Sequence, residues 1–282
     1  RLKTLAEPPE GRVLLAGSGP LLLALGAELA RLGRPPVAIV EAGRPLSHPI
    51  AALGLPMSYL REGAEYLLRL KLAGVPVLAG SHLAAIRAKD GALVADIDTP
   101  KGRRSLTVDR IALHDGIASN DIGLPDCPAL PVLRAGDCRE ALADGRAQGT
   151  ALAAQLLGQP QPAPAPEVAR QRAAQALVAR LHAHDGASRL GALPGDTVIC
   201  RCEARTVNDL RALGPDPTDR QLRLDGRFSM GPCQGRFCAE WTARLAAPDT
   251  PKPRLGAPRW PARPIAIADL LAAPDETQGD PA

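Results

Sequence analysis

Short apolar runs and longer helical repeats alternate along the first forty residues. Residues 12–16 form a short apolar run, and Gly-Ser-Gly-Pro follows directly at residues 17–20. Residues 21–32, rich in Leu and Ala, predict a helix that ends at Gly33, and residues 37–40 form a second apolar run. The order strand, glycine turn, helix and strand predicts a βαβ unit.

The same periodicities predict the elements that follow. We expect helices over residues 59–73, 139–157 and 167–184, and strands over residues 75–78, 83–87, 92–97, 105–108, 110–114 and 131–135. Turns at Asp90-Gly91 and Lys101-Gly102 join three of these strands as a meander. The fold class is therefore α/β, with a Rossmann-like nucleotide-binding domain that contains a β-meander.

Proline divides the rest of the chain. Residues 158–166 contain four prolines and predict a stiff, extended linker. We expect a nucleotide-binding domain over residues 1–157, a second domain over 167–245 and a proline-rich tail over 246–282.

Composition excludes several classes of function. Aromatic residues make up only 2% of the chain and the net charge is +4, so a nucleic-acid partner is not expected. No apolar run reaches the length of about 18 residues that a membrane span requires, and a signal peptide is not expected. Clustered cysteines without a disulfide framework fit a reducing cytoplasm.

The glycine turn has the features of a dinucleotide site. Gly17 permits a tight turn, Gly19 lets a pyrophosphate approach the backbone, and Pro20 opens the helix whose N-terminal amides face the phosphates. Glu41 ends the next strand and can accept a hydrogen bond from a ribose hydroxyl, which favours NAD over NADP. The third glycine of the motif is replaced by Leu22. An α/β unit without a nucleotide is the alternative interpretation.

Four cysteines near the C-terminus carry the most specific signal. Cys200 and Cys202 form a C-x-C pair, and Cys233 and Cys238 form a C-x4-C pair after thirty intervening residues. Two thiolate pairs on separate loops can converge on one iron–sulfur cluster or one zinc ion. The glycines around the second pair let backbone amides approach the sulfurs. A zinc site seldom uses C-x-C, and a disulfide within that pair would be strained. The pattern favours the cluster, with zinc and disulfides as alternatives.

Three motifs resemble one family of oxidoreductase subunits. They are G-S-G-P-L-L-L at residues 17–23, C-R-C-E at 200–203 and M-G-P-C-Q-G-R-x-C at 230–238. The family comprises FAD/NAD-type subunits of octopine and nopaline oxidases, hydroxyproline dehydrogenases and hydrogen cyanide synthase. The resemblance implies a glutathione-reductase-type nucleotide domain and a small, α-rich, bacterioferritin-associated-ferredoxin-like [2Fe-2S] domain.

The resemblance also implies a flavin contact. In that architecture Gly136 and Asp137, at the end of a strand, contact the ribitol of FAD, and the following helix faces the pyrophosphate. The family opens with a separate FAD-binding βαβ unit, and no G-x-G-x-x-G motif stands before residue 17 here. Either that unit lies on a partner chain, which would share FAD or another adenine nucleotide, or it is missing from this sequence, or the remaining unit holds a nucleotide for structure only. NAD is a further possible ligand.

The expected function is electron transfer. We expect a subunit of a hetero-oligomeric flavin dehydrogenase that acts on amines or amino acids, with substrate oxidised on an amino-acid-oxidase-type partner flavoprotein and electrons passing through the cluster. His82, His114 and Cys138 are not expected to carry chemistry, and neither His182 nor His184 is expected to ligate the cluster. A self-contained NAD(P)H-dependent reductase and a non-enzymatic cluster scaffold with a vestigial nucleotide unit are the alternatives.

Overall fold

A computed structural model describes residues 7–115, 138–163, 165–185 and 190–247. The chain divides into two compact units, with residues up to 119 and 133–184 in the first, and residues 120–132 and those from 185 onward in the second. The expected flavin contacts Gly136 and Asp137 lie outside the described residues.

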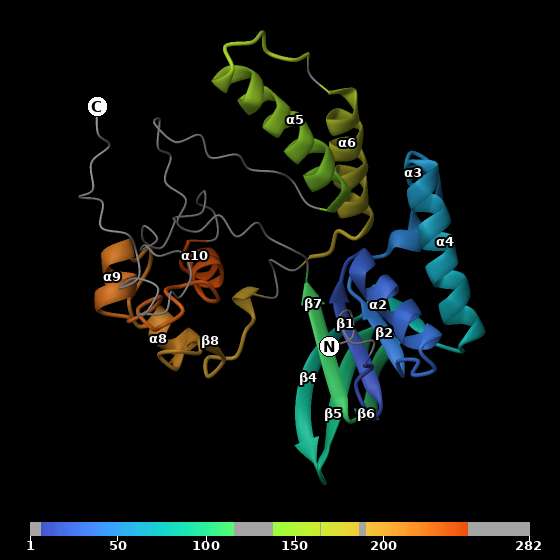
Figure 1. The fold of residues 1–282 in the computed structure, drawn as a ribbon. Helices are drawn as coiled ribbons and strands as arrows, with labels where there is room; N and C mark the ends of the chain where they lie inside the picture. The colour runs from blue at the N-terminus through green and yellow to red at the C-terminus, as the bar shows by residue number, and fades with distance from the viewer. Residues whose placement is uncertain (1–6, 116–137, 164, 186–189, 248–282) are drawn as a thin grey trace. The chain divides into compact units, whose positions relative to one another are not determined.

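The first unit is built on a four-stranded parallel sheet (Figure 1). Its strands are β1 (Val13–Ser18), β2 (Ala38–Glu41), β3 (Val77–Ala79) and β7 (Arg110–Asp115), in the order β3-β2-β1-β7. The helix α2 (Pro20–Arg31) joins β1 to β2. The 3-10 helix η1 (Pro45–Ser47) and the helices α3 (Pro49–Ala52) and α4 (Met57–Leu72) lead from β2 to β3. The predicted Rossmann-like α/β fold is confirmed.

A three-stranded antiparallel meander lies between β3 and β7 in the chain. It consists of β4 (His82–Lys89), β5 (Ala92–Thr99) and β6 (Gly102–Val108), in that spatial order. The register of β5 against β6 runs from Leu93 opposite Val108 to Thr99 opposite Gly102. The turns Asp90-Gly91 and Lys101-Gly102 therefore join these strands as predicted.

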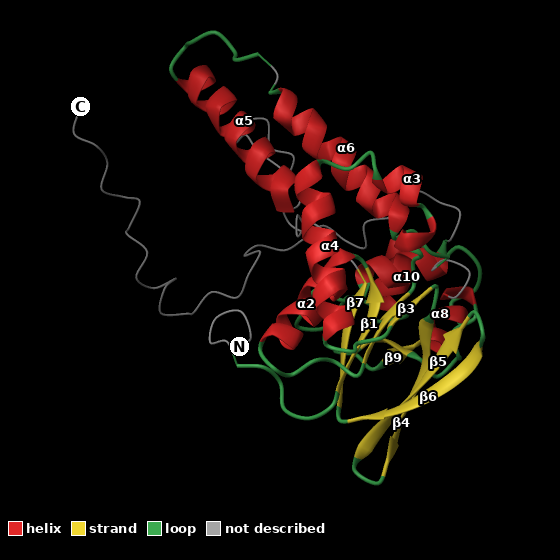
Figure 2. Cartoon of the chain, turned by 90° about the vertical axis from the view of Figure 1, so that its right-hand side faces the viewer, coloured by secondary structure: helices red, strands yellow, loops and turns green. Residues whose placement is uncertain are grey.

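The alternation of side chains along β1 divides the core of this unit into two layers. Val13 and Leu15 face α2 and α4, whereas Leu14 and Ala16 face the meander. Because successive side chains of a strand point to opposite faces, one continuous apolar run can serve both layers. The helices and the meander thus cover opposite faces of the parallel sheet (Figure 2).

Two long helices complete the first unit. The helices α5 (Cys138–Leu156) and α6 (Pro166–Leu181) pack against each other, and Asp144 and Arg172 form an ion pair of 3.3 Å between them. Of the proline-rich segment expected at 158–166, the described residues 158–163 and 165 lie between the two helices, and Pro166 is the first residue of α6. The division between the two compact units falls after residue 184 rather than at this segment, because α6 buries Ala174 and Leu181 within the first unit.

The second unit is small and rich in short helices. It contains the strands β8 (Val198–Cys200) and β9 (Arg205–Thr206) and the helices α8 (Val207–Arg211), α9 (Asp219–Leu224) and α10 (Ala239–Ala246). Its core consists of Leu210, Leu222 and Phe228 together with Cys200 and Cys238. Two of its five buried core residues are therefore cysteines of the C-terminal motif.

Capping boxes fix the starts of two of these helices. The Thr206 hydroxyl accepts from the Asp209 amide at the start of α8, and Thr218 does the same with Gln221 at the start of α9. Among the helices that the structure describes, none is both long and apolar enough to cross a membrane.

Candidate functional site

The glycine turn forms at the carboxyl ends of β1 and β7. Gly17 has a φ of 140°, and a Cβ there would lie only 1.6 Å from the His114 carbonyl oxygen. Gly19 has a φ of 113° and precedes Pro20, the first residue of α2. Only glycine adopts such backbone angles without strain, and Gly17 also needs the space. The turn therefore has the backbone geometry that the motif predicts.

Close packing of α2 on the sheet depends on Gly26, which the nucleotide motif did not predict. A Cβ at Gly26 would lie 2.6 Å from Ile39 Cδ1 and 3.1 Å from Leu70 Cδ2. Leu22, which replaces the motif's third glycine, is 1% exposed and belongs to the core. Gly26 thus supplies the close helix approach one turn later. Its position inside the Leu- and Ala-rich repeat was the available signal.

Glu41 lies at the carboxyl end of β2, as predicted, but its carboxylate is only 1% exposed. Oε1 accepts hydrogen bonds from Ser18 Oγ at 3.1 Å and from the Gly43 amide at 2.9 Å. Oε2 accepts from the Gly19 amide at 3.1 Å. The acid expected to bind a ribose hydroxyl is therefore satisfied by donors of its own chain.

His182, which follows the last residue of α6, covers this carboxylate. Its carbonyl oxygen accepts a hydrogen bond from Ser18 Oγ at 3.0 Å. Its Nδ1 lies 3.3 Å from Glu41 Oε2, although the pair lacks the alignment of a hydrogen bond. A Cβ at Gly43 would approach the His182 backbone to 2.7 Å. No local pattern indicates these contacts, because His182 is 164 residues from Ser18.

Two other histidines lie near the edges of the sheets. The His114 ring lies beside the glycine turn, with Nε2 3.7 Å from a Cβ placed on Gly19. His82 Nε2 lies 3.5 Å from Asp98 on the neighbouring strand of the meander. Neither histidine is part of an acid–base pair at the turn among the residues that the structure describes.

In the second unit, the structure brings the four cysteines near one another as two pairs. The Cys200 thiol lies close enough to Cys238, and the Cys202 thiol close enough to Cys233, for each to influence the other's ionisation. Cys200 is also close enough to Cys202 for their charges to interact. Cys200 and Cys238 are buried, Cys233 is half-buried and Cys202 is exposed, and all four are free thiols. Each pair joins one cysteine from either loop.

Backbone amides point at Cys233. Desolvation opposes its ionisation, but amide hydrogen bonds from Phe237, Gly235 and Arg236, together with the Cys202 thiol, outweigh that effect and hold the pKa of Cys233 below its ordinary value. The predicted approach of glycine-rich backbone to sulfur is thereby found at Gly235. A thiolate is stabilised at this position.

The partner thiols have raised pKa values. Burial raises the pKa of Cys238, and its contact with Cys200 adds to the effect, whereas hydrogen bonds from Ser229 oppose it. A Cys233 amide favours the Cys202 thiolate, but the contact with the Cys233 thiol, desolvation and neighbouring charge together hold the pKa of Cys202 above its ordinary value. Sulfurs this close cannot all ionise unless positive charge is supplied.

The loops that hold the cysteines have constrained backbones. Ala204, Ser229 and Gln234 are non-glycine residues with φ values of 51°, 61° and 51°. A Cβ on Gly231 would lie 2.3 Å from the Cys202 Cβ, so the two loops are in direct contact there. Backbone strain of about 1–3 kcal/mol per residue gathers at functional sites. The constrained backbone of these loops therefore helps to hold the four cysteines in fixed positions.

Within the described residues, no three His, Cys, Asp or Glu side chains surround a single point at which one metal ion could sit. The role of the four cysteines as cluster ligands stays a prediction.

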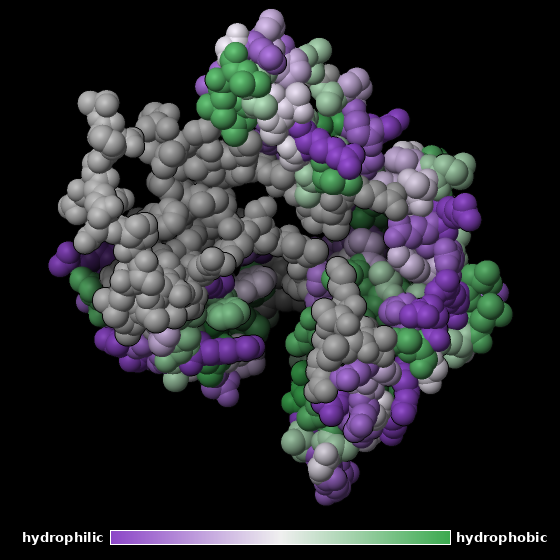
Figure 3. Space-filling model, in the orientation of Figure 1, coloured by the Kyte–Doolittle hydropathy of each residue, from purple (hydrophilic) through white to green (hydrophobic). Residues whose placement is uncertain are grey.

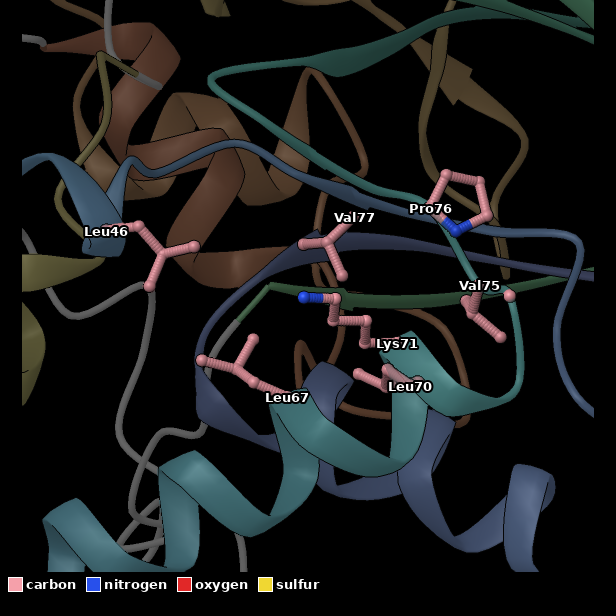
Figure 4. Close-up of a pocket in the computed structure, with 8 residues that line it drawn as sticks. Leu46, Leu67, Leu70, Lys71, Val75, Pro76 and Val77 are labelled. Atoms are coloured by element: carbon pink, nitrogen blue, oxygen red, sulfur yellow. The ribbon is translucent and has the colours of Figure 1, made fainter.

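An apolar pocket of about 400 Å³ lies at the β3 edge of the first unit. It is lined by α4 and the start of β3, with Leu67, Leu70 and Val77 facing one another and Lys71 as its one ionisable residue (Figure 4). Its lining contains no carboxylate, thiol or imidazole, so it offers no catalytic chemistry.

Comparison with known proteins finds relatives along most of the chain. The chain is 27% identical to the A subunit of opine oxidase from Agrobacterium tumefaciens (strain Ach5), over 97% of this chain and 63% of the relative. It is 28% identical to the corresponding opine oxidase protein of Rhizobium meliloti, over 97% of this chain and 60% of the relative. Hydrogen cyanide synthase subunit HcnB of Pseudomonas aeruginosa is 27% identical, over 94% of this chain and 68% of the relative.

The chain is thus similar to named subunits of oxidoreductases, and it spans about 60% of the length of the opine oxidase subunits. No family model matches it. Two solved structures show a partial likeness. OxyS anhydrotetracycline hydroxylase from Streptomyces rimosus is 16% identical, with a TM-score of 0.26, over 38% of this chain and 31% of that chain. The p-nitrophenol 4-monooxygenase PnpA from Pseudomonas putida DLL-E4 is 17% identical, with a TM-score of 0.27, over 38% of this chain and 41% of that chain.

Proposed function

We propose that this chain is an electron-transfer subunit of a multi-subunit flavin-dependent dehydrogenase. The observation that carries the proposal is the pairing of four free thiols from two loops, Cys200 with Cys238 and Cys202 with Cys233. The similarity to subunits of opine oxidase and hydrogen cyanide synthase supports the same class of protein.

The donor set fits a [2Fe-2S] cluster. Such a cluster takes four thiolates, two for each iron, and the two loops supply four free cysteines. When bound, the cluster supplies one-electron transfer. The amides around Cys233 would donate to its sulfur, and the burial of Cys200 and Cys238 would lower the local dielectric.

The partner is proposed to be a flavoprotein that oxidises an amine or amino acid. The names of the relatives, which are subunits, support an assembly of this kind. The first unit also exposes apolar side chains at Leu46, Ile50, Leu53 and Met57, each at 62% or more. Apolar residues lie beside hydrophilic ones on the face in Figure 3. Exposed apolar surface of this kind favours association.

The glycine turn is proposed to bind the adenosine diphosphate part of FAD or of another adenine nucleotide, with NAD as a further possibility. Gly17, Gly19, Pro20 and the N-terminus of α2 supply the phosphate side of that site. In the resemblance, Gly136 and Asp137 would add a flavin contact before α5. Ligand binding at this turn requires Glu41 to exchange its present partners for ribose hydroxyls.

The saturated state of Glu41 also supports a second candidate function. If its internal hydrogen bonds are permanent, the nucleotide unit is a structural platform and the chain is a non-enzymatic carrier of the cluster. A titration with ADP separates the two candidates. Measurable binding that Gly19→Val abolishes supports the nucleotide site, and its absence supports the carrier.

The main test is cluster content. Chain purified without oxygen should contain two irons and two sulfides, with visible absorption that dithionite bleaches. Cys233→Ser should remove about all of this iron, because a serine oxygen replaces the amide-stabilised sulfur. The matched control is Cys138→Ser, a cysteine outside the four. Full iron content in Cys233→Ser, or zinc alone in the wild type, would overturn the cluster assignment.

Electron transfer is tested with the partner present. The chain should not oxidise amines or amino acids when purified alone. With a co-expressed partner flavoprotein, it should co-purify and pass electrons from substrate to an artificial acceptor. The Cys233→Ser complex should still reduce its flavin with substrate but should lose transfer to the acceptor. A monomer that holds FAD and turns over substrate unaided would contradict the proposed role within a larger complex.

A further inference from the structure

We propose that the end of α6 is a lid on the nucleotide site, so that residues 181–184 and a bound adenosine exclude each other. This inference rests on the nucleotide-binding part of the proposed function and adds a regulation to that site. Its basis is the position of His182, which lies directly over the carboxylate that a ribose would need.

The contacts of His182 leave no room for a sugar. Its Nδ1 lies 3.3 Å from Glu41 Oε2, so the two atoms are in van der Waals contact and no other atom fits between them. The side chains of His182 and Glu41 are only 11% and 1% exposed. A ribose hydroxyl must come within about 2.7–3.0 Å of a carboxylate oxygen to donate a hydrogen bond. The atoms of the ring would then occupy the present position of the imidazole.

The backbone of the lid is held as firmly as its side chain. The His182 carbonyl accepts from Ser18 Oγ at 3.0 Å, inside the glycine turn itself. Gly43 lies against the same peptide, since a Cβ there would come within 2.8 Å of its carbonyl carbon and Cα. Glycine at position 43 therefore permits closure, which gives this residue a role that the nucleotide motif does not require.

Further contacts along α6 hold the lid in place. The Tyr59 hydroxyl on α4 donates to Gln171 Oε1 at 3.0 Å. Near α3, a Cβ on Gly54 would lie 3.2 Å from Leu177 Cδ2. Closure thus depends on the seating of the whole helix, and weakening a contact far from Glu41 should also favour the open state.

The first test measures ADP affinity by calorimetry with the full chain. His182→Ala removes the side chain over Glu41, and Tyr59→Phe removes one hydrogen bond that holds α6. Tyr59→Phe should tighten ADP binding roughly two- to tenfold, the ratio that corresponds to one net hydrogen bond. His182→Ala should also tighten it, because the imidazole no longer occupies the position of the ribose. Tyr66→Phe is the matched control, because the Tyr66 hydroxyl donates to Glu62 within α4 itself. It should leave the affinity unchanged.

The second test follows the lid directly. Diethyl pyrocarbonate labels accessible imidazoles, and His48, which is exposed and lies outside residues 181–184, serves as the internal reference. Saturating ADP should raise labelling of His182 severalfold relative to His48 in the wild type and should change nothing in Gly19→Val. Binding of ADP with His182 still protected would overturn the lid.

The outcomes separate this inference from the proposed function. If neither the wild type nor His182→Ala binds ADP, the lid and the nucleotide assignment both fail. The electron-transfer assignment is then untouched, because it is decided by iron, sulfide and the Cys233→Ser variant. Equal ADP affinity in the wild type, His182→Ala and Tyr59→Phe would also refute the lid, while leaving the nucleotide site in place.

Discussion

The two units treat their candidate ligand groups in opposite ways. In the first unit, the Glu41 carboxylate is surrounded by donors of its own chain, from Ser18, Gly19 and Gly43. In the second, the thiols of Cys200 and Cys202 have the thiols of the opposite loop as near neighbours. A carboxylate with three hydrogen-bond donors is satisfied without a ligand. Neighbouring thiols, by contrast, can all ionise only when a positively charged ligand is bound.

This difference determines how each unit is stabilised. The first unit has two apolar layers on either side of a parallel sheet, and none of their buried residues belongs to the candidate site. In the second, the buried core includes Cys200 and Cys238. The ligand set and the core are partly the same residues there. The first unit should therefore be stable without a ligand, and the second should depend on one.

The largest effect is expected from Gly17→Ala, which tests the self-sufficiency of the first unit. The new Cβ would lie 1.6 Å from a backbone oxygen on β7, so the sheet itself must shift. We expect the free energy of unfolding to fall by about 5 kcal/mol or more, a change that only exceptional substitutions cause. Denaturant unfolding followed by amide exchange of β1 and β2 measures it.

Gly33→Ala is the matched control for that prediction. Gly33 also has a positive φ, of 71°, but a Cβ there meets no atom within 4 Å. Gly33→Ala should lower the free energy of unfolding by only about 1 kcal/mol, because the alanine backbone is strained at this φ. Similar losses in both variants would show that the glycine turn is not packed against β7 as described.

Removal of the proposed cluster should have the next largest effect, confined to the second unit. A unit of this size gains only about 3–5 kcal/mol from its apolar core, so losing the ligand of two core cysteines should leave it unfolded. Amide exchange of α9 and α10 should become fast after iron is removed with a chelator, while exchange of β1 and β2 stays slow. Unchanged protection in both units would contradict this contrast between them.

Most of the fold could be predicted because its signals are local. The strand and helix boundaries of the first unit agree with the apolar periodicity to within about two residues for most elements. The glycine turn was predicted from adjacent residues, which lie only a few positions apart in the chain.

The parts that were missed depend on distant contacts. The placement of α6 with the first unit follows from packing on α5 and from His182, far from Ser18 in sequence. A proline-rich composition indicates an extended segment, but it does not say which two elements that segment joins. The pairing of Cys200 with Cys238 likewise follows from how two loops meet, not from their spacing.

The smallest effect concerns the caps of two helices in the cysteine unit, whose partner groups differ in charge. Thr206→Ala and Thr218→Ala each remove a hydroxyl that caps a helix, and each should cost about 1 kcal/mol at pH 7. The partner at α8 is the Asp209 carboxylate, and the partner at α9 is the neutral amide of Gln221. Only the first of these can titrate.

The sign of the pH effect follows from Asp209. A backbone hydrogen bond from Thr206, its hydroxyl and the charge of Arg205 hold the pKa of Asp209 below its ordinary value of 3.8. A lowered carboxyl pKa stabilises the fold above the unfolded value, and this contribution is lost as pH falls through the folded value. The penalty of Thr206→Ala should therefore be constant between pH 7 and 5 in urea titrations, and should shrink only below 3.8. The penalty of Thr218→Ala should not change with pH, because Gln221 keeps its charge state. A decline for Thr206→Ala already at pH 5 would show that Asp209 is not held ionised by this cap.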